Sequence, residues 1–422
     1  MDKALEGRVA GKIAWRILPF LAVLYVVSYL DRVNVSFAAL TMNADLGMSA
    51  TLYGWGAGIF FFGYLLFQVP SNLLLERFGP RRWIAAIMLA WGAVSVAMGA
   101  IDSPWSFMAA RFLLGLAEAG FFPGMILYLT YWVAPAHRGR IIAGFMFAIP
   151  IATVIGAPLS SLILSSFHGA IAGWRWLFIL EGAPALLGAL AVLLLLPDRP
   201  VNAKWMTDEE KAWLAQAQAP PADLPALGRS VAGVMLAPEV LRFAAIYFGL
   251  ALCNYGLGLW LPQMIKAAGA GTANAALLTA LPYGFAAVAM VLWGLWVDSR
   301  GKVVASSVWI PTFLAAIGLI GSAYAHWLPL QMALFSLAAV GTLAAISSFW
   351  TLPTARLPAA ETAVAVAMIN STGNLGGFVG PFVVGWIKDA THSFQNGLLF
   401  VAACVAVSGV LLAVGGRKTS GT

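Results

Sequence analysis

The chain has 422 residues, of which 61% are hydrophobic and only 10% are charged, whereas a soluble globular domain carries about 25% charged residues. With a mean hydropathy of +0.87, this composition excludes a soluble protein and predicts an integral membrane protein with many spans. The net charge of +7 does not indicate a nucleic-acid partner, because most cations fall in short loops on one side of the predicted membrane.

Twelve apolar segments are long enough to cross the hydrocarbon core, which takes roughly 20 residues per helix. Six fall in the first half of the chain, at 17–40, 51–75, 83–101, 105–133, 139–166 and 174–196. Six more fall in the second half, at 240–266, 273–297, 303–324, 328–353, 362–388 and 396–415. We therefore expect an all-α integral membrane protein with twelve transmembrane helices in two pseudo-symmetric six-helix bundles, residues 1–196 and 240–422.

A polar linker, residues 197–239, separates the two sets of spans. In it Thr207 and Glu210 have the spacing of a capping box, which opens a short amphipathic helix. We interpret this segment as a cytoplasmic linker and not as a catalytic domain. Residues 1–16 are polar and lack the pattern of a cleaved signal peptide, so we expect the first span to be retained.

Lys and Arg residues mark the cytoplasmic side, because they are enriched in short inner loops. With the N terminus inside, all but five of the 24 Lys and Arg residues lie in inner segments. Arg175, Lys266 and Lys388 lie on the outer side, and Arg32 and Arg111 lie within predicted spans. This bias predicts that both termini are cytoplasmic.

The first span carries two adjacent charges, Asp31 and Arg32. An ionisable residue at bilayer depth costs roughly 2.5–3.5 kcal/mol on insertion scales, which makes it a functional-site candidate. Adjacent residues point about 100° apart around a helix, so these two charges do not form one ion pair along it. Each is expected to meet another group, which is a neighbouring helix, a proton or a substrate.

An acid, a glycine and cations recur in the loops after the second and the eighth span. In each loop the acid can face a helix N terminus, the glycine makes a tight turn and the cations hold the loop inside. Repetition at the same place in two six-span halves is typical of transporters built from repeats. We assign a conformational role to the loop residues Glu76, Arg77, Gly79, Arg81, Asp298, Gly301 and Lys302.

The fourth span carries Arg111 and Glu118, seven residues apart, which places them on one helix face about 10.5 Å apart along the axis. With Asp31 and Arg32 they form a set of two acids and two cations that has no net charge. Arginine stays protonated, whereas a carboxylate in a low-dielectric site can take up a proton. One proton leaves the set at a charge of +1, which attracts an anion, and loss of the proton releases the anion.

Arginine suits a carboxylate ligand, because its fork donates two parallel hydrogen bonds. The alternative interpretation is that the four charges pair with one another and hold the first and fourth spans together. The two interpretations are compatible, since a pair can be structural in one state of a transporter and open in another. Glu181, towards the outer end of the sixth span, is the remaining deep ionisable residue.

The two loops match the loop signature of the major facilitator superfamily, and further stretches resemble its anion:cation symporter family. These stretches are Tyr-Leu-Asp-Arg-Val-Asn at 29–34, 63–72 in the second span, 111–123 in the fourth, Gly-Trp-Arg-Trp at 173–176 with Glu-Gly at 181–182, and 370–381 in the eleventh. The Leu-Pro-Asp-Arg-Pro sequence at 196–200 is most similar to bacterial tartrate, sugar-acid and aromatic-carboxylate permeases. The first loop departs from the superfamily pattern at Asn72, where Gly is usual, and at Glu76, where Asp is usual, and both keep the same physical role.

This resemblance implies the major facilitator fold and a role for three residues. Asp31 and Glu118 match proton sites of the family, and Arg32 matches the residue that contacts the substrate carboxylate. The stretch 145–152 in the fifth span is apolar, where some sugar-acid permeases of the family have a polar ligand residue. This difference argues against a heavily hydroxylated substrate.

Polar side chains at similar depth are candidates for further substrate contacts. We favour substrate contact for Tyr29, Tyr64 and Asn374. Hydrogen bonding between helices is an equal alternative for Gln68, Asn254, Tyr255 and Asn370. Asn370 shares a helix face with Asn374, so the predicted substrate-binding set is Tyr29, Arg32, Tyr64, Arg111, Asn370 and Asn374.

We expect a proton-coupled symporter that imports a small organic anion, such as tartrate, a sugar acid or an aromatic acid, by alternating access. It is expected to be a monomer of the bacterial inner (plasma) membrane, whose partners are the anion, protons and the lipid bilayer, with no cofactor. The alternative is a proton antiporter that exports hydrophobic compounds, which requires a roomy apolar cavity and little contribution from Arg32. An enzyme is disfavoured because the sequence has no metal-ligand cluster or nucleophile–base arrangement. A channel is disfavoured because pore-lining rings come from symmetric subunits, which a single chain with two halves does not indicate.

Overall fold

The computed structural model describes residues 3–133, 145, 147–167, 169–218, 229–300 and 304–416, and its regular elements are helices. Eleven helical segments in this part of the chain are long and apolar enough to cross a membrane. The remaining predicted span, 362–388, lies in a helix of 33 residues, whose polar residues Asn370 and Asn374 lower its hydropathy. Residues 139–144 and 146 of the predicted fifth span lie outside the described residues. The all-α membrane fold is therefore confirmed.

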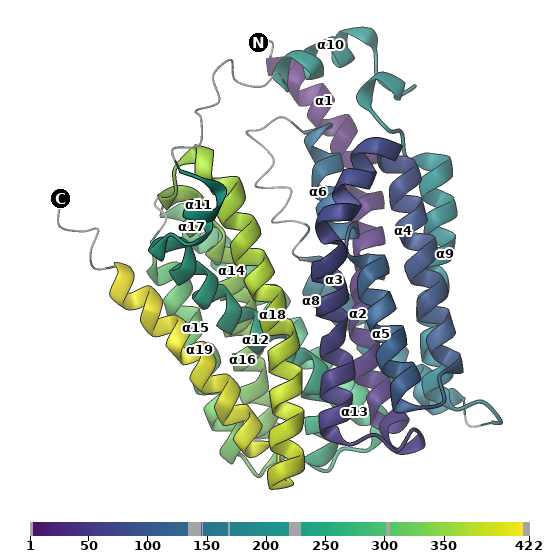
Figure 1. Ribbon diagram of the computed structural model, residues 1–422, viewed down its shortest axis with the longest axis vertical. Coiled ribbons are helices and arrows are strands. Elements are labelled where there is room, and N and C mark those ends of the chain that lie inside the picture. Colours follow the sequence, from purple (N-terminus) through teal and green to yellow (C-terminus); the bar gives the residue numbers. More distant parts are fainter. Residues whose placement is uncertain are drawn as a thin grey trace.

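The helices form two groups along the chain. The first group and the linker comprise α1 (Lys3–Arg16), α2 (Leu18–Asp45), α3 (Ala50–Phe78), α4 (Pro80–Ala97), η1 (Met98–Ala100), α5 (Pro104–Glu118), α6 (Phe121–Thr130), α8 (Ala148–Ser166), α9 (Gly173–Leu195), η2 (Pro200–Asn202), α10 (Asp208–Ala217) and α11 (Val231–Met235). The second comprises α12 (Pro238–Ala267), α13 (Thr272–Leu278), α14 (Ala280–Ser299), α15 (Ser306–Tyr324), α16 (Leu328–Phe349), α17 (Thr351–Arg356), α18 (Ala359–Thr391) and α19 (Gln395–Gly416). Figure 1 shows the purple and blue helices of the first half in one bundle and the green and yellow helices of the second half in another.

Local signals explain where the helices begin and end. The hydroxyl of Ser49 accepts a hydrogen bond from the backbone N–H of Leu52 at 3.2 Å and caps the start of α3. Gly79 ends this helix with a φ of 85°, a backbone conformation that glycine adopts without steric cost. Pro80 then opens α4, because the first turn of a helix tolerates its missing N–H. The tight turn predicted at Gly79 is therefore present.

Three predicted spans are each divided into two α-helices, which their hydropathy did not indicate. The predicted span 328–353 is divided at Trp350, between α16 and α17. The predicted span 105–133 is divided at Gly120 between α5 and α6, and a Cβ at this glycine would clash with the hydroxyl of Ser71 on α3. The predicted span 273–297 is divided at Thr279, just before α14. Pro282 lies in the first turn of that helix, where it supplies no N–H to continue the preceding helix.

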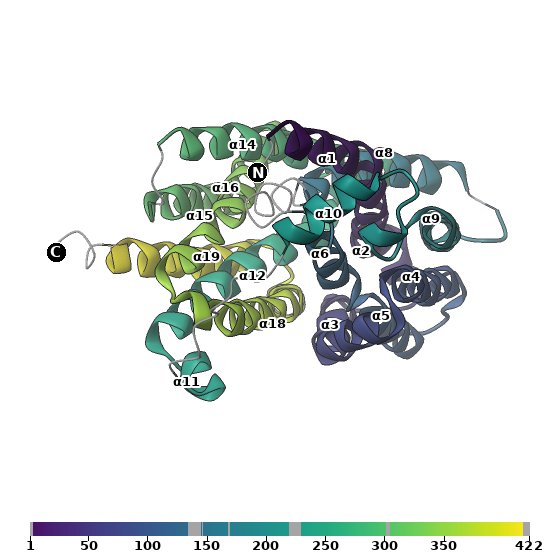
Figure 2. The same ribbon diagram turned by 90° about the horizontal axis from the view of Figure 1, so that it is seen from above.

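Within the described part of the chain, the two bundles contact each other closely at one end of the molecule. We call the end that carries α1 and α10 the linker end and the opposite end the far end (Figure 1). At the far end, a Cβ at Gly54 of α3 would clash with the carbonyl oxygen of Pro381 on α18, and a Cβ at Gly385 with that of Ala50. Towards the linker end the ribbons of α3 and α18 diverge (Figure 1). Figure 2 shows α1 and α10 lying over the first-half bundle at the linker end.

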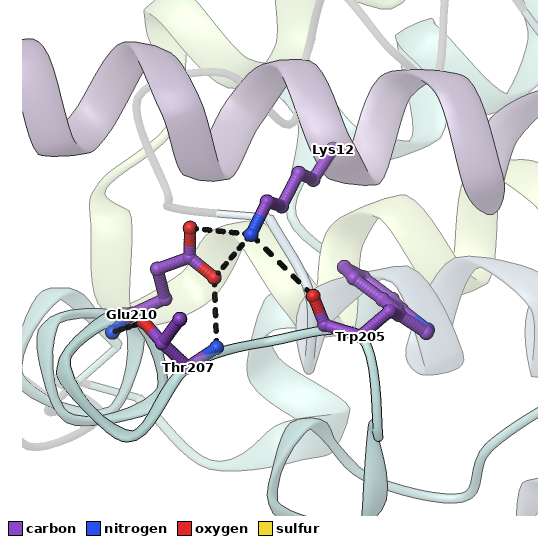
Figure 3. A network of polar contacts seen from close by, with 4 residues as sticks. All are labelled: Lys12, Trp205, Thr207 and Glu210. Atoms are coloured by element: carbon purple, nitrogen blue, oxygen red, sulfur yellow. Dashed lines mark hydrogen bonds and ion pairs between the residues drawn. The ribbon is translucent and has the colours of Figure 1, made fainter.

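The linker helix α10 is attached to α1 by a polar network (Figure 3). The ammonium group of Lys12 lies 2.8 Å from a carboxylate oxygen of Glu210 and donates to the carbonyl of Trp205 at 3.4 Å. The same carboxylate accepts from the backbone N–H of Thr207 at 2.9 Å, and the Thr207 hydroxyl accepts from the N–H of Glu210 at 3.3 Å. The predicted capping box is thus confirmed. The hydrogen bond from Lys12, assisted by Thr207 and nearby cations, lowers the pKa of Glu210 although burial opposes this shift.

Arg81, just after the loop that follows the second span, binds the start of α4 to the end of α9 through hydrogen bonds. The backbone N–H of Arg81 donates to the Asp198 carboxylate at 3.0 Å, and its guanidinium donates to the carbonyl of Leu193 at 2.6 Å. Glu76, Arg77 and Asp298 are exposed in this structure, so the predicted contact of Glu76 with a helix N terminus is absent from this state of the described chain. Gly301 and Lys302 lie outside the described residues.

Candidate functional site

A buried ion pair joins the first and fourth predicted spans. A terminal guanidinium nitrogen of Arg32, on α2, lies 2.5 Å from Glu118 Oε1, at the end of α5. The Ser28 hydroxyl, one turn before Arg32, donates to the same oxygen at 2.7 Å. Arg32 is only 9% exposed and Glu118 only 2%. The charge of the carboxylate is therefore balanced by the Arg32 guanidinium, and Ser28 adds a hydrogen bond. The alternative interpretation, that charges of the first and fourth spans pair with one another, holds for these two residues in this state.

Asp31 lies in a setting without a cation within ion-pair distance among the described residues. Its Oδ1 accepts hydrogen bonds from the amide of Asn34 at 2.8 Å and from the hydroxyl of Ser95. Its Oδ2 is buried and has no partner among the described residues. Because Ser95 lies on α4, Asp31 faces the third predicted span, which agrees with the expectation that it meets a neighbouring helix. Two neutral donors satisfy one oxygen, and the other is available to a proton.

Arg111 is the cation whose donors are least satisfied in this region. It is 1% exposed, and one terminal nitrogen donates to the carbonyl of Ala57 at 3.3 Å. Its Nε and Nη1 are buried with no hydrogen-bond partner among the described residues. Close contact of α3 and α5 positions this side chain, since a Cβ at Gly63 would clash with the carbonyl of Phe112. A buried guanidinium with two free donors is ready to receive an acceptor from a ligand.

One aromatic ring brings the two arginines together. The guanidinium carbon of Arg32 lies 5.3 Å from the ring centre of Phe60, and that of Arg111 lies 5.0 Å from the same centre. The two guanidinium carbons are therefore within about 10 Å of each other. Arg32 also lies 5.3 Å from the ring of Tyr64 and 5.9 Å from that of Tyr29. Cation–π contacts of this kind stabilise a desolvated cation.

Both arginines line one narrow cavity between the two bundles. The first half contributes Tyr29, Arg32, Phe61 and Arg111 to its wall. The second half contributes Asn254 and Tyr255 from α12 and Tyr283 from α14. In this state the cavity has room for about one water molecule, so a larger ligand requires movement of its walls.

Three predicted substrate residues lie outside the wall of this cavity, and two residues with evenly weighed roles line it. Asn370 and Asn374, on α18, are not among the residues that line this cavity, and the amide nitrogen of Asn374 is buried without a partner among the described residues. Asn254 and Tyr255, which we weighed equally as packing residues, do line it. The predicted Tyr64 is not among the lining residues, and its ring contacts Arg32, which is.

Other residues of the site carried little or no signal in the sequence. Phe61 and Tyr283 line the cavity, but an aromatic residue in an apolar span is indistinguishable by composition from one that packs against lipid. Ser28 and Ser95 hydrogen-bond to the two acids, and small hydroxyl residues occur throughout membrane helices. Glu181 of α9, noted without a role, is 4% exposed and accepts from the Ser160 hydroxyl of α8 at 2.8 Å.

Comparison with known proteins agrees with this arrangement. A sequence profile described as "Major Facilitator Superfamily" matches residues 21–381. A protein of Agrobacterium vitis named "Putative tartrate transporter" is 45% identical over 98% of this chain and 93% of its own length. A "Quinolone resistance transporter" of Acinetobacter baumannii is 39% identical over 96% of this chain and 94% of its own length.

A solved structure has the same fold. The crystal structure of a bacterial homologue of the human lysosomal transporter Spinster, in an inward-facing and occupied conformation, superposes with a TM-score of 0.79 at 16% identity, over 96% of this chain and 97% of that one. These comparisons confirm the predicted family and fold. They also confirm that the chain is a transporter and not an enzyme. The chain is a multi-pass membrane transporter of small molecules and belongs to the major facilitator superfamily.

Proposed function

We propose that this protein is a proton-coupled importer of a small organic anion. The observation that carries the proposal is the unequal setting of the four buried charges. One acid is paired with a cation, the other acid has only neutral donors, and one cation keeps free donors. This asymmetry suits a site that holds a proton on one group and an anion on another.

We infer a protonation state for each acid from its hydrogen bonds. Glu118 contacts Arg32 at 2.5 Å and Ser28 at 2.7 Å, and a carboxylate in such a pair is ionised because the cation stabilises its charge. Asp31 has an unpartnered Oδ2, and an ionised carboxylate with a bare buried oxygen is costly. We therefore place a proton on Asp31 Oδ2 in this state, and Glu118 acts as the fixed counter-charge until Arg32 moves.

With Asp31 neutral, the four-residue set carries one net positive charge. The free donors of Arg111 and the fork of Arg32 lie on the same cavity, so they are the groups that an incoming carboxylate meets. Loss of the proton from Asp31 returns the set to neutrality and removes the attraction for the anion. Uptake of one proton with one anionic charge follows from this balance.

Transport requires the cavity to open to each side in turn. We propose that residues 1–196 and 240–422 move as two units about the cavity, with residues 197–239 as the cytoplasmic linker between them. With the linker on the cytoplasmic side of a bacterial inner membrane, both termini are cytoplasmic and the far end is periplasmic. The far end is closed in this state, so the protein is in an inward-facing state. A single chain encloses the site from both halves, so a monomer suffices.

The residues of the cavity wall support a chemical class for the substrate. Two guanidinium groups suit carboxylates, while the rings of Tyr29, Phe61, Tyr255 and Tyr283 suit a compact or planar body. The relatives named as tartrate transporters support a small carboxylate. Tartrate, a sugar acid and an aromatic acid are the candidates.

The second candidate function is a proton antiporter that exports hydrophobic compounds. It is favoured by the relative named as a quinolone resistance transporter. The cavity is narrow and includes two buried arginines, whereas this function requires a roomy apolar cavity. We therefore prefer the import of an anion.

The test is uptake into proteoliposomes of labelled tartrate, gluconate and nicotinate, with the outside made acidic and with a protonophore as control. We expect at least one acid to accumulate only while the pH gradient exists. Arg32→Ala is expected to abolish binding, whereas Asp45→Asn, on the same helix, keeps an acceptor for its hydrogen bond from Trp174 at 2.7 Å and serves as the matched control. Uptake of every acid at the same level with and without the gradient would contradict the proposal.

A further inference from the structure

A carboxylate from one bundle caps a helix of the other bundle at the far end of the molecule. Asp389 lies two residues before the end of α18. Its Oδ1 accepts a hydrogen bond from the backbone N–H of Ala50 at 3.0 Å, and its Oδ2 accepts one from that of Thr51 at 2.7 Å. These are the first two residues of α3, so both carboxylate oxygens are bound at the N terminus of a helix more than 300 residues away in the chain.

This contact completes a cap that α3 lacks on its own. The first N–H groups of a helix have no partner within the helix, and they lie at the positive end of its dipole. The hydroxyl of Ser49, the residue before α3, accepts from the backbone N–H of Leu52. Asp389 supplies the acceptors for the other two N–H groups, with a charge of the favourable sign. Charge-assisted hydrogen bonds of this kind are about twice as strong as neutral ones.

The contact depends on the closed arrangement of the far end. Next to it, Gly54 of α3 touches the backbone of Pro381, and Gly385 of α18 touches the backbone of Ala50. Any motion that separates α3 from α18 here moves Asp389 away from both N–H groups. Other contacts between the bundles at this end are made by neutral acceptors, as in the bonds from Tyr53 to the carbonyl of Leu259 at 2.9 Å and from Lys266 to that of Leu40 at 2.7 Å.

The corresponding acid of the first half does not have this role in the present state. Glu76 lies two residues before the end of α3, as Asp389 does in α18, but it is exposed at the linker end. The structure therefore shows a cap between the bundles at the closed end, made by Asp389, while the acid at the diverging end is free of a described partner.

We propose that Asp389 is a positioning residue of the transport cycle, which holds the far end closed by capping α3 and must be released before the cavity opens to that side. The residue acts through the position of α3 and contacts neither the anion nor the coupling proton. The proposal rests on movement of the two halves about the cavity and is independent of which ion drives transport.

The test measures access to the cavity from the far side. Cys253 and Cys404 are replaced by Ser, and Leu259, which lines the cavity, is replaced by Cys. Vesicles with the far end outside are treated with a membrane-impermeant maleimide. Loss of the two charge-assisted bonds shifts the balance between the closed and open far end, and we expect Asp389→Ala to increase the labelling rate roughly tenfold, with Asp389→Asn between this variant and the parent.

Controls separate a gate from a folding defect. Asp389→Glu, which keeps the charge, should restore slow labelling, and Asp102→Asn, an exposed carboxylate at the same end, should label like the parent. The melting temperature of each variant in detergent shows whether it is folded. If folded Asp389→Ala and Asp389→Asn label at the parental rate, the proposal is wrong. Because labelling needs neither substrate nor a pH gradient, that result would leave the proposed anion transport untouched.

Discussion

Removal of Arg32 should destabilise the protein mainly through the acid that it leaves behind. A guanidinium nitrogen of Arg32 lies 2.5 Å from Oε1 of Glu118, and the two side chains are 11% and 2% exposed. In Arg32→Ala, the one hydrogen bond that Glu118 keeps from the described residues is that from Ser28. Removing one partner of a buried pair costs about 3–5 kcal/mol, because the remaining charge is uncompensated.

A second substitution isolates this cost. Glu118→Gln in the Arg32→Ala background removes the unpaired charge and keeps a group that accepts from Ser28, so we expect the double variant to recover at least half of the lost stability. The assay is a double-mutant cycle by thermal or denaturant unfolding in detergent. Both variants should fail to bind the anion, since each lacks Arg32. If the double variant is as unstable as Arg32→Ala, then Glu118 is not an ionised partner and the assignment of charges is wrong.

Three further results are expected. Arg111→Gln should weaken anion binding at least tenfold in a thermal-shift titration. It should lower the stability less than Arg32→Ala does, because Arg111 bonds only to the carbonyl of Ala57 among the described residues. Equal losses of stability in the two variants would contradict this. Gly115→Val should unfold the protein or abolish its expression, because even a Cβ there clashes with the carbonyl of Phe60 and overpacking costs about 1–3 kcal/mol or more. Lys12→Met should raise hydrogen exchange in α10 at neutral pH. Because the pKa of Glu210 is lowered, the stability from this contact is present above the ordinary pKa of the acid and is lost as the pH falls through the lowered value. Parent and variant should therefore exchange alike in strong acid, and a difference that persists there would refute the role of the ion pair.

The helices and the charged site could be predicted from the sequence to different extents. Length and hydropathy suffice to locate membrane spans, because each must cross the same thickness of hydrocarbon. The divisions at Gly120 and Thr279 could not be predicted, since they depend on which residue of another helix comes close, such as Ser71 beside Gly120. The capping box at Thr207 was predicted correctly because both of its partners lie within one turn.

Within the site, charge was predictable and partners were not. Four ionisable residues in apolar spans are costly, which identifies them without a structure, and Arg32 does meet Glu118. The contact of Asp31 with Ser95, on the third span, depends on the order of helices in the bundle. The cap of Asp389 on α3 joins residues more than 300 positions apart, and no periodicity within either helix indicates it.

The most direct test of the central claim is the proton movement that accompanies the anion. A pH-sensitive dye inside proteoliposomes, with no imposed gradient, reports whether addition of the transported acid outside carries protons inward. We predict inward proton flux for the parent and none for Asp31→Asn, which should still exchange labelled for unlabelled anion across the membrane. Inward proton flux in Asp31→Asn equal to that of the parent would contradict the assignment of the coupling proton to Asp31.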